Sequence, residues 1–157
     1  MDPLERIVSG GQTGVDRGAL DAAIDADVAH GGWCPAGHKA EDGVISERYG
    51  LVPISSPDYS ARTAANVRDS DGTLILCFGP LSGGTKLTHQ LASGRKPVLV
   101  IDLQSDTDSG IDDVCRWIAG HDIRRLNVAG PRESTRPGIQ DQARQFIGRL
   151  LSSARGG

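Results

Sequence analysis

The stretch that decides the fold is Ile7-Val8-Ser9-Gly10-Gly11-Gln12-Thr13-Gly14, in which a short apolar strand over residues 6–9 runs into a glycine-rich turn. Apolar residues then recur at helical spacing and predict a helix over residues 16–26. A strand, a glycine-rich turn and a helix present backbone N–H groups at the positive end of the helix dipole, where anions bind. The turn has neither the Walker lysine nor G-x-G-x-x-G spacing. It therefore predicts either an anion site or a tight turn without a ligand.

A second unit of the same kind begins near the middle of the chain. Residues 73–78 are almost continuously apolar, which is typical of a central parallel strand buried on both faces. A second glycine-rich turn follows over residues 79–85, and a helix is expected over residues 86–93. Both turns follow the carboxyl end of a strand, so in a parallel sheet they lie on the same edge and face one ligand. This repetition strengthens the prediction of an anionic ligand.

The remaining pattern alternates strands and helices. Further strands are expected over residues 28–34, 51–55, 97–103 and 123–128, and further helices over 58–69, 112–119 and 139–151. Residues 39–45 look like a charged surface loop, and residues 152–157 like a frayed tail. The alternation predicts a doubly wound α/β fold with a mostly parallel sheet and helices on both faces. No linker divides the chain, so residues 1–157 are expected to form a single domain with an ordered core at about 6–151.

Composition argues against several classes of function. The 157 residues carry a formal net charge of −3 and no block of basic residues, so nucleic-acid binding is not expected. No apolar run is long enough for a membrane span and no signal-peptide pattern occurs, so no membrane contact is expected. Three widely spaced cysteines favour a reducing, cytoplasmic location over a disulfide framework. The four histidines lack metal-ligand spacing, so no metal site is expected.

Several polar side chains near the expected turns are candidates for binding a ligand. Asp16 either favours the helix N-terminus or points at a ligand hydroxyl. Trp33 follows two glycines and either stacks on a flat ring or covers the edge of the core. Arg62 and Asn66 share one helix face, and Arg62 either binds a phosphate or forms a surface salt bridge. The candidate ligand-binding set is Gly10, Gly11, Gln12, Thr13, Gly14, Asp16, Trp33, Arg62, Asn66, Ser82, Gly83, Gly84 and Thr85.

Two other segments offer polar groups without a clear role. The 39–45 segment carries Lys39, Glu41 and Asp42, which are either solvated or part of the site. A third turn follows the strand over residues 123–128 and offers Asn127, Gly130, Arg132, Glu133 and Ser134. No G-x-S-x-G motif and no nucleophile–base pair stands out by its spacing, so no catalytic residue is assigned.

Several motifs together resemble the putative molybdenum carrier family, over about residues 7–150. They are the turns over residues 9–18, 32–35 and 81–85, the 62–71 segment, and the stretch 127–134. This resemblance implies a Rossmann-like fold, a homo-oligomer (a dimer or tetramer), and binding of the molybdenum cofactor or a related phosphorylated ligand. The same superfamily contains lysine-decarboxylase-like phosphoribohydrolases and nucleotide-sensing domains.

The resemblance to the phosphoribohydrolases also suggests what the chain lacks. Their P-G-G-x-G-T-x-x-E motif ends in a glutamate that serves catalysis, and Thr88 stands at the matching place here. Loss of a general acid or base typically costs about 10²–10⁴-fold in rate. A non-catalytic carrier of the molybdenum cofactor or a related phosphorylated ligand is therefore favoured. The alternatives are a nucleotide sensor, or a nucleoside 5′-monophosphate hydrolase that takes its carboxylate from Asp16, Glu41, Asp42 or Glu133.

Overall fold

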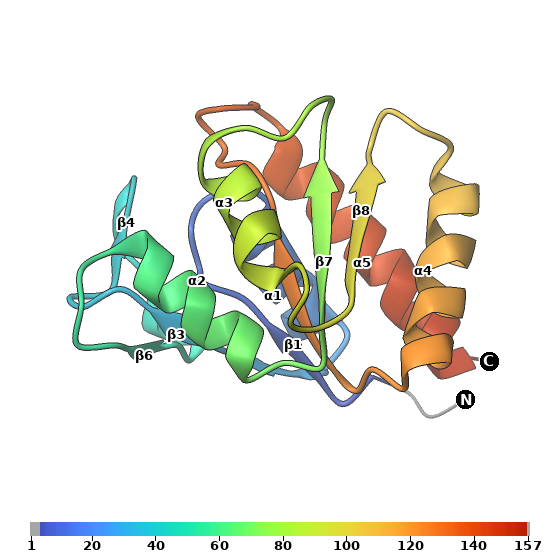
Figure 1. The fold of residues 1–157 in the computed structure, drawn as a ribbon, viewed down its shortest axis with the longest axis horizontal. Coiled ribbons are helices and arrows are strands. Elements are labelled where there is room, and N and C mark those ends of the chain that lie inside the picture. The colour runs from blue at the N-terminus through green and yellow to red at the C-terminus, as the bar shows by residue number, and fades with distance from the viewer. Residues whose placement is uncertain (1–3, 157) are drawn as a thin grey trace.

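A computed structural model describes residues 4–156 and shows an α/β domain built on a five-stranded parallel sheet (Figure 1). The strand order is β2-β1-β9-β7-β8, with β9 between β1 and β7, and every pair is parallel. The strands are β1 (Arg6–Val8), β2 (Ala29–Gly31), β7 (Gly72–Cys77), β8 (Val98–Asp102) and β9 (Arg125–Ala129). The predicted fold class is therefore confirmed, and β7 lies inside the sheet with all six residues buried.

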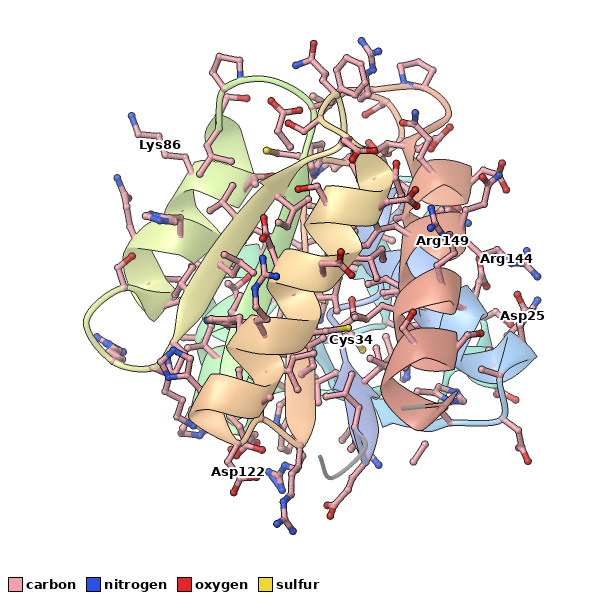
Figure 2. All side chains as sticks on the ribbon, turned by 90° about the vertical axis from the view of Figure 1, so that its right-hand side faces the viewer. Asp25, Cys34, Lys86, Asp122, Arg144 and Arg149 are labelled. Carbon is pink, nitrogen blue, oxygen red and sulfur yellow. The ribbon has the colours of Figure 1, made fainter. Side chains whose placement is uncertain are left out.

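Helices cover both faces of the sheet, as Figures 1 and 2 show from two directions. On one face lie α1 (Val15–Asp25), α4 (Thr107–His121) and α5 (Ile139–Gly156), and on the other lie α2 (Tyr59–Arg68) and α3 (Gly83–Ala92). The main core fills the space beneath α1, α4 and α5. It includes Leu74, Leu76, Leu126, Val128, Ile118, Phe146, Ile147 and Leu150.

A small side unit replaces the single strand that was expected over residues 28–34. Gly32 has a φ of 142°, and a Cβ there would lie 2.3 Å from the carbonyl oxygen of Ser9, so the chain turns at this glycine. Before it, β2 joins the main sheet; after it, β3 (Trp33–Cys34) pairs with β6 (Val52–Pro53). The expected loop over 39–45 is instead a short hairpin of β4 (Lys39–Ala40) and β5 (Gly43–Val44), and a 3₁₀ helix, η1 (Glu47–Tyr49), follows.

Three helix boundaries differ from the prediction by three residues or more. Helix α3 begins at Gly83 rather than residue 86, and Gly83 has a φ of 53°, a backbone conformation that favours glycine. Helix α4 begins at Thr107 rather than residue 112, and the Asp106 side chain caps it by accepting the N–H of Ser109 at 3.3 Å. Helix α5 continues past the expected end at residue 151 to Gly156, and Gly157 lies outside the described residues. Between residues 4 and 156 no helix is long and apolar enough to cross a membrane.

Candidate functional site

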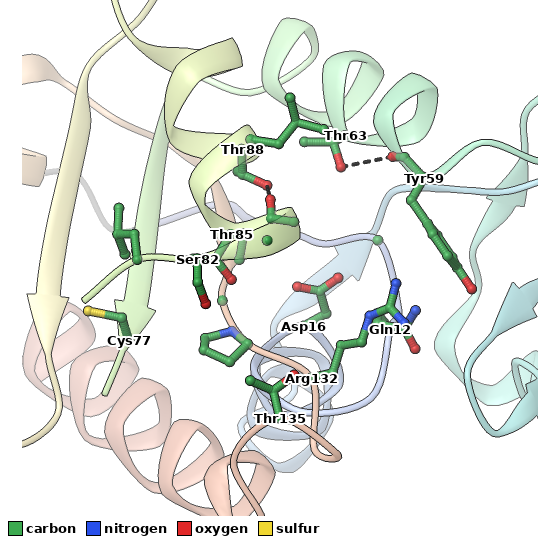
Figure 3. A pocket seen from close by; sticks show the side chains of 18 of the residues that line it. Gln12, Asp16, Tyr59, Thr63, Cys77, Ser82, Thr85, Thr88, Arg132 and Thr135 are labelled. Atoms are coloured by element: carbon green, nitrogen blue, oxygen red, sulfur yellow. Dashed lines mark hydrogen bonds between the residues drawn. The ribbon is translucent and has the colours of Figure 1, made fainter. Parts of the chain in front are cut away.

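A cleft opens at the carboxyl ends of β1, β7 and β9, where the turns that follow these strands meet helix α2 (Figure 3). Because β9 lies between β1 and β7, its turn contributes to the cleft together with the two glycine-rich turns. Nine of the thirteen candidate residues line the cleft: Gly10, Gln12, Asp16, Arg62, Asn66, Ser82, Gly83, Gly84 and Thr85. The expectation that both glycine-rich turns face one space therefore agrees with the geometry.

The turn between β1 and α1 uses most of its N–H groups inside the protein. The Thr13 N–H donates to Gln12 Oε1 at 3.0 Å, and the Gly14 N–H donates to Gln140 Oε1 at 3.2 Å. The Val15 N–H donates to the carbonyl oxygen of Pro131 at 3.1 Å. Gly14 has a φ of 84°, and a Cβ there would lie 2.2 Å from that same oxygen. Because Gly14 has no Cβ, the start of α1 can pack closely against the β9–α5 turn.

The turn between β7 and α3 is different because its first N–H groups have no acceptor. Ser82 begins the helix without a side-chain cap, and its carbonyl oxygen accepts the N–H of Lys86 at 3.2 Å. Within residues 4–156, nothing accepts a hydrogen bond from the N–H of Gly83, Gly84 or Thr85. A Cβ on either glycine would meet no atom within 4 Å, so the space above them is open. Free N–H groups at the positive end of a helix dipole are suited to an anion.

Arg62 and Asp16 form a buried ion pair in the wall of the cleft. Arg62 Nη1 lies 2.8 Å from Asp16 Oδ2, with side-chain exposures of 12% and 5%. Burial raises the pKa of the Asp16 carboxyl, and the guanidinium of Arg62 partly offsets that rise. Gly10 makes the contact sterically feasible, because a Cβ there would lie 1.6 Å from Arg62 Nη1. The charge of Arg62 is thus already paired with a carboxylate of this chain.

Hydrogen-bond donors predominate around this pair. Gln12 is buried, and its Oε1 accepts the N–H groups of Thr13 and Glu41 at 3.0 and 2.9 Å. That arrangement fixes the amide and leaves Gln12 Nε2 without a partner, and Arg62 Nε also has none. Like the free N–H groups of α3, these unpartnered donors belong to residues that line the cleft.

Four candidate residues, Gly11, Thr13, Gly14 and Trp33, do not line the cleft. The Trp33 indole Nε1 donates to Asp69 at 2.6 Å, beyond the C-terminal end of α2. Asn66 holds the Trp33 backbone with both ends of its amide, accepting the N–H at 2.7 Å and donating to the carbonyl oxygen at 3.0 Å. These hydrogen bonds attach β3, through Trp33, to helix α2.

Most of the carboxylates considered for a hydrolase have partners outside the cleft. Glu41 accepts hydrogen bonds from the hydroxyls of Thr13 and Ser134, and these bonds lower the pKa of Glu41. Asp42 pairs with Arg17 at 2.6 Å. Glu133 accepts the N–H groups of Gly138 and Gln140 at the start of α5. Of the described carboxylates, Asp16 alone lines the cleft.

At the position of the hydrolase glutamate, Thr88 donates its hydroxyl hydrogen to the carbonyl oxygen of Gly84 at 3.0 Å (Figure 3). Its hydroxyl cannot replace a carboxylate as a proton carrier near neutral pH. Among the described residues there is also no group of three or more His, Cys, Asp or Glu side chains placed to hold a metal ion. The cleft is thus suited to an acceptor-rich ligand, and Asp16 is the one carboxylic acid among its described lining residues.

Fifteen of the residues that line the cleft were absent from the candidate set, and Tyr59 and Arg132 are the two with large polar side chains. Tyr59, the first residue of α2, forms part of the wall, and Arg132 reaches in from the β9–α5 turn. Figure 3 shows the side chains of both among those that line the cleft. The sequence signal for Arg132 was its glycine-containing turn after a strand. Tyr59 has no such signal, because nothing in the local sequence indicates which helix end meets the sheet edge.

Comparisons with known proteins place the chain in a family. A family model described as "Circularly permutated YpsA SLOG family" matches residues 7–151. A solved structure, described as "Putative molybdenum carrier protein" from Syntrophus aciditrophicus SB, is 43% identical, with a TM-score of 0.90. The match covers 94% of each chain. A search of curated proteins finds no match.

Proposed function

The chain belongs to the circularly permutated YpsA SLOG family, and on that premise we propose that it binds a phosphorylated small molecule without chemically changing it. The observation that carries the proposal is the start of α3, where the N–H groups of Gly83, Gly84 and Thr85 open into the cleft without acceptors. A phosphate oxygen accepts such hydrogen bonds, and the helix dipole favours its negative charge. Phosphate is therefore the group expected at this end of the cleft.

The molybdenum cofactor is the ligand that we favour, because the solved relative is described as a putative molybdenum carrier protein. The cleft fits the phosphate end of such a ligand through the N–H groups of α3. The described residues offer no cluster of metal ligands, so the molybdenum would remain bound by the cofactor's own sulfur atoms as part of the cargo. Other phosphorylated ligands, including nucleotides, satisfy the same donors.

A binding role is favoured over hydrolysis by the state of Asp16. An acid–base catalyst must exchange protons with the substrate, but the Asp16 carboxylate accepts a hydrogen bond from Arg62 and is buried. Thr88 replaces the glutamate of the related hydrolases and donates back to the helix. The cleft therefore has the groups that hold a phosphate but lacks a free catalytic acid.

The test is native mass spectrometry of the purified protein with the molybdenum cofactor and, separately, with AMP, together with chromatography for free adenine. We expect the intact mass of the ligand to be retained and no adenine to form. Release of adenine in proportion to enzyme and time would overturn the binding role in favour of a phosphoribohydrolase. An Asp16→Asn variant would then show whether Asp16 is the acid.

A further inference from the structure

The enclosed part of the cleft is smaller than the ligands proposed for it. Its cavity volume is about 140 Å³, whereas pockets that hold a whole drug-sized ligand occupy roughly 300–1,000 Å³. A phosphate and its neighbouring atoms fit inside, and the rest of the molecule must extend through the mouth. The side chains at the mouth are therefore in a position to contact the ligand.

Three cations from three separate segments surround the ring of Tyr59 at this mouth. The guanidinium carbon of Arg132 lies 4.8 Å from the ring centroid, Lys39 Nζ lies 5.4 Å from it, and the guanidinium carbon of Arg62 lies 5.7 Å from it. Lys39 comes from strand β4, Arg132 from the β9–α5 turn, and Tyr59 itself begins α2. Each contact is within the range of a cation–π interaction.

The charges of these three cations are not equally compensated. Arg62 is paired with Asp16, but neither Lys39 nor Arg132 forms an ion pair with any described residue. Glu41 attracts Arg132 from a distance, but its carboxylate is bound by the hydroxyls of Thr13 and Ser134. Both Lys39 and Arg132 lie close to the same ring centroid, so an anion bound beside the ring is attracted to both charges.

We propose that Lys39, Tyr59 and Arg132 form a second anion-binding subsite at the mouth of the cavity. It receives a second phosphate, or another anionic group, of a ligand whose first phosphate lies at the start of α3. The inference rests on the proposed function and narrows it: the ligand class is one with two or more anionic groups, and a nucleoside monophosphate occupies only the inner part of the site.

The test compares AMP with ATP by isothermal titration calorimetry in magnesium-free buffer. The wild-type protein is expected to bind ATP about tenfold tighter than AMP, or more. Lys39→Gln and Arg132→Gln each remove one cation of the subsite, and we expect the ratio of ATP to AMP affinity to fall toward one in both. Tyr59→Leu, which removes the ring that positions both cations, should lower the same ratio.

Arg116→Gln is the matched control, because Arg116 lies on α4, is exposed and does not line the cleft. It should keep the wild-type ratio of ATP to AMP affinity. That result would show that a lower ratio in the other variants does not come from the change in net charge alone. Equal affinity of the wild type for AMP and ATP, or an unchanged ratio in both cation variants, would overturn the subsite while leaving the inner phosphate site standing. If the wild type binds neither nucleotide, the subsite fails, and retention of the molybdenum cofactor in native mass spectrometry then tests the proposed function separately.

Discussion

Arg62 reaches from α2 across Gly10 to donate a hydrogen bond to Asp16 on α1, and the two groups are 2.8 Å apart. This contact joins two helices from opposite faces of the sheet at the wall of the cleft. It also means that the most obvious cation for a phosphate is neutralised by the protein itself. The anion-binding capacity of the cleft therefore comes from backbone N–H groups and from Arg132 and Lys39.

Replacing Arg62 is expected to lower the stability of the protein, because it leaves the Asp16 carboxylate buried without its partner. Removal of one member of a buried pair typically costs about 3–5 kcal/mol. We expect Arg62→Ala to lower the free energy of unfolding by about 3 kcal/mol in urea denaturation. The double variant Arg62→Met with Asp16→Asn should lose less than Arg62→Ala alone. Strict additivity of Arg62→Met and Asp16→Asn, each measured alone, in this double variant would contradict the pairing.

Gly84→Val tests the backbone phosphate site with little risk to the fold. The new Cβ meets no atom within 4 Å, so the variant should fold, but its side chain would occupy the space in front of the free N–H groups. We expect calorimetry to show at least a tenfold loss of affinity for AMP with a small change in melting temperature. Gly120→Val on α4 is the control, because its Cβ also enters open space and Gly120 does not line the cleft. Wild-type affinity in a folded Gly84→Val protein would rule out this site.

Trp33 is expected to matter for stability rather than for binding. Its indole N–H donates to the Asp69 carboxylate, and this bond lowers the pKa of Asp69. Trp33→Phe removes that bond and should lower the free energy of unfolding by about 1.5–3 kcal/mol. The affinity for AMP should stay within about twofold of the wild type by calorimetry. A tenfold weaker affinity would restore the role in ring stacking that the sequence suggested.

Glu41 should make the stability of the protein depend on acid pH. Hydrogen bonds from Ser134 and Thr13 hold its pKa below the ordinary value of 4.5. The stabilisation is fully present above the unfolded-state pKa and is lost as pH falls through the lower folded-state pKa. The difference in unfolding free energy between wild type and Glu41→Gln should therefore shrink between about pH 6 and pH 3. A difference that is constant over this range in urea titrations would contradict the role of the carboxylate.

The repeated pattern of strand, glycine-rich turn and helix was enough to predict the parallel sheet and the edge at which the cleft opens. It could not reveal which N–H groups remain free. The N–H groups of Gly14 and Val15 are satisfied by Gln140 and Pro131, which are more than a hundred residues away in the chain. Nor could it reveal that Gly32 divides the expected 28–34 strand between two sheets, because the close approach to Ser9 exists only after the main sheet has formed.

The same limit applies to individual side chains of the site. The spacing of Arg62 and Asn66 correctly placed both on one helix face, and both line the cleft. Their partners, Asp16 and the Trp33 backbone, come from other elements and depend on how α2 packs against the sheet edge. Tyr59, Lys39 and Arg132 meet for the same reason, although nothing in their sequence spacing connects them.

The central claim is that the N-terminus of α3, rather than that of α1, holds the phosphate. Two-dimensional ¹H–¹⁵N NMR of the labelled protein during titration with AMP tests it most directly, because both glycine-rich turns report in the same spectrum. The account predicts that the amide signals of Gly83, Gly84 and Thr85 shift the most and exchange more slowly with solvent once AMP is bound. The largest shifts at Gly10, Gly11 and Gly14, with the amides of α3 unmoved, would contradict it.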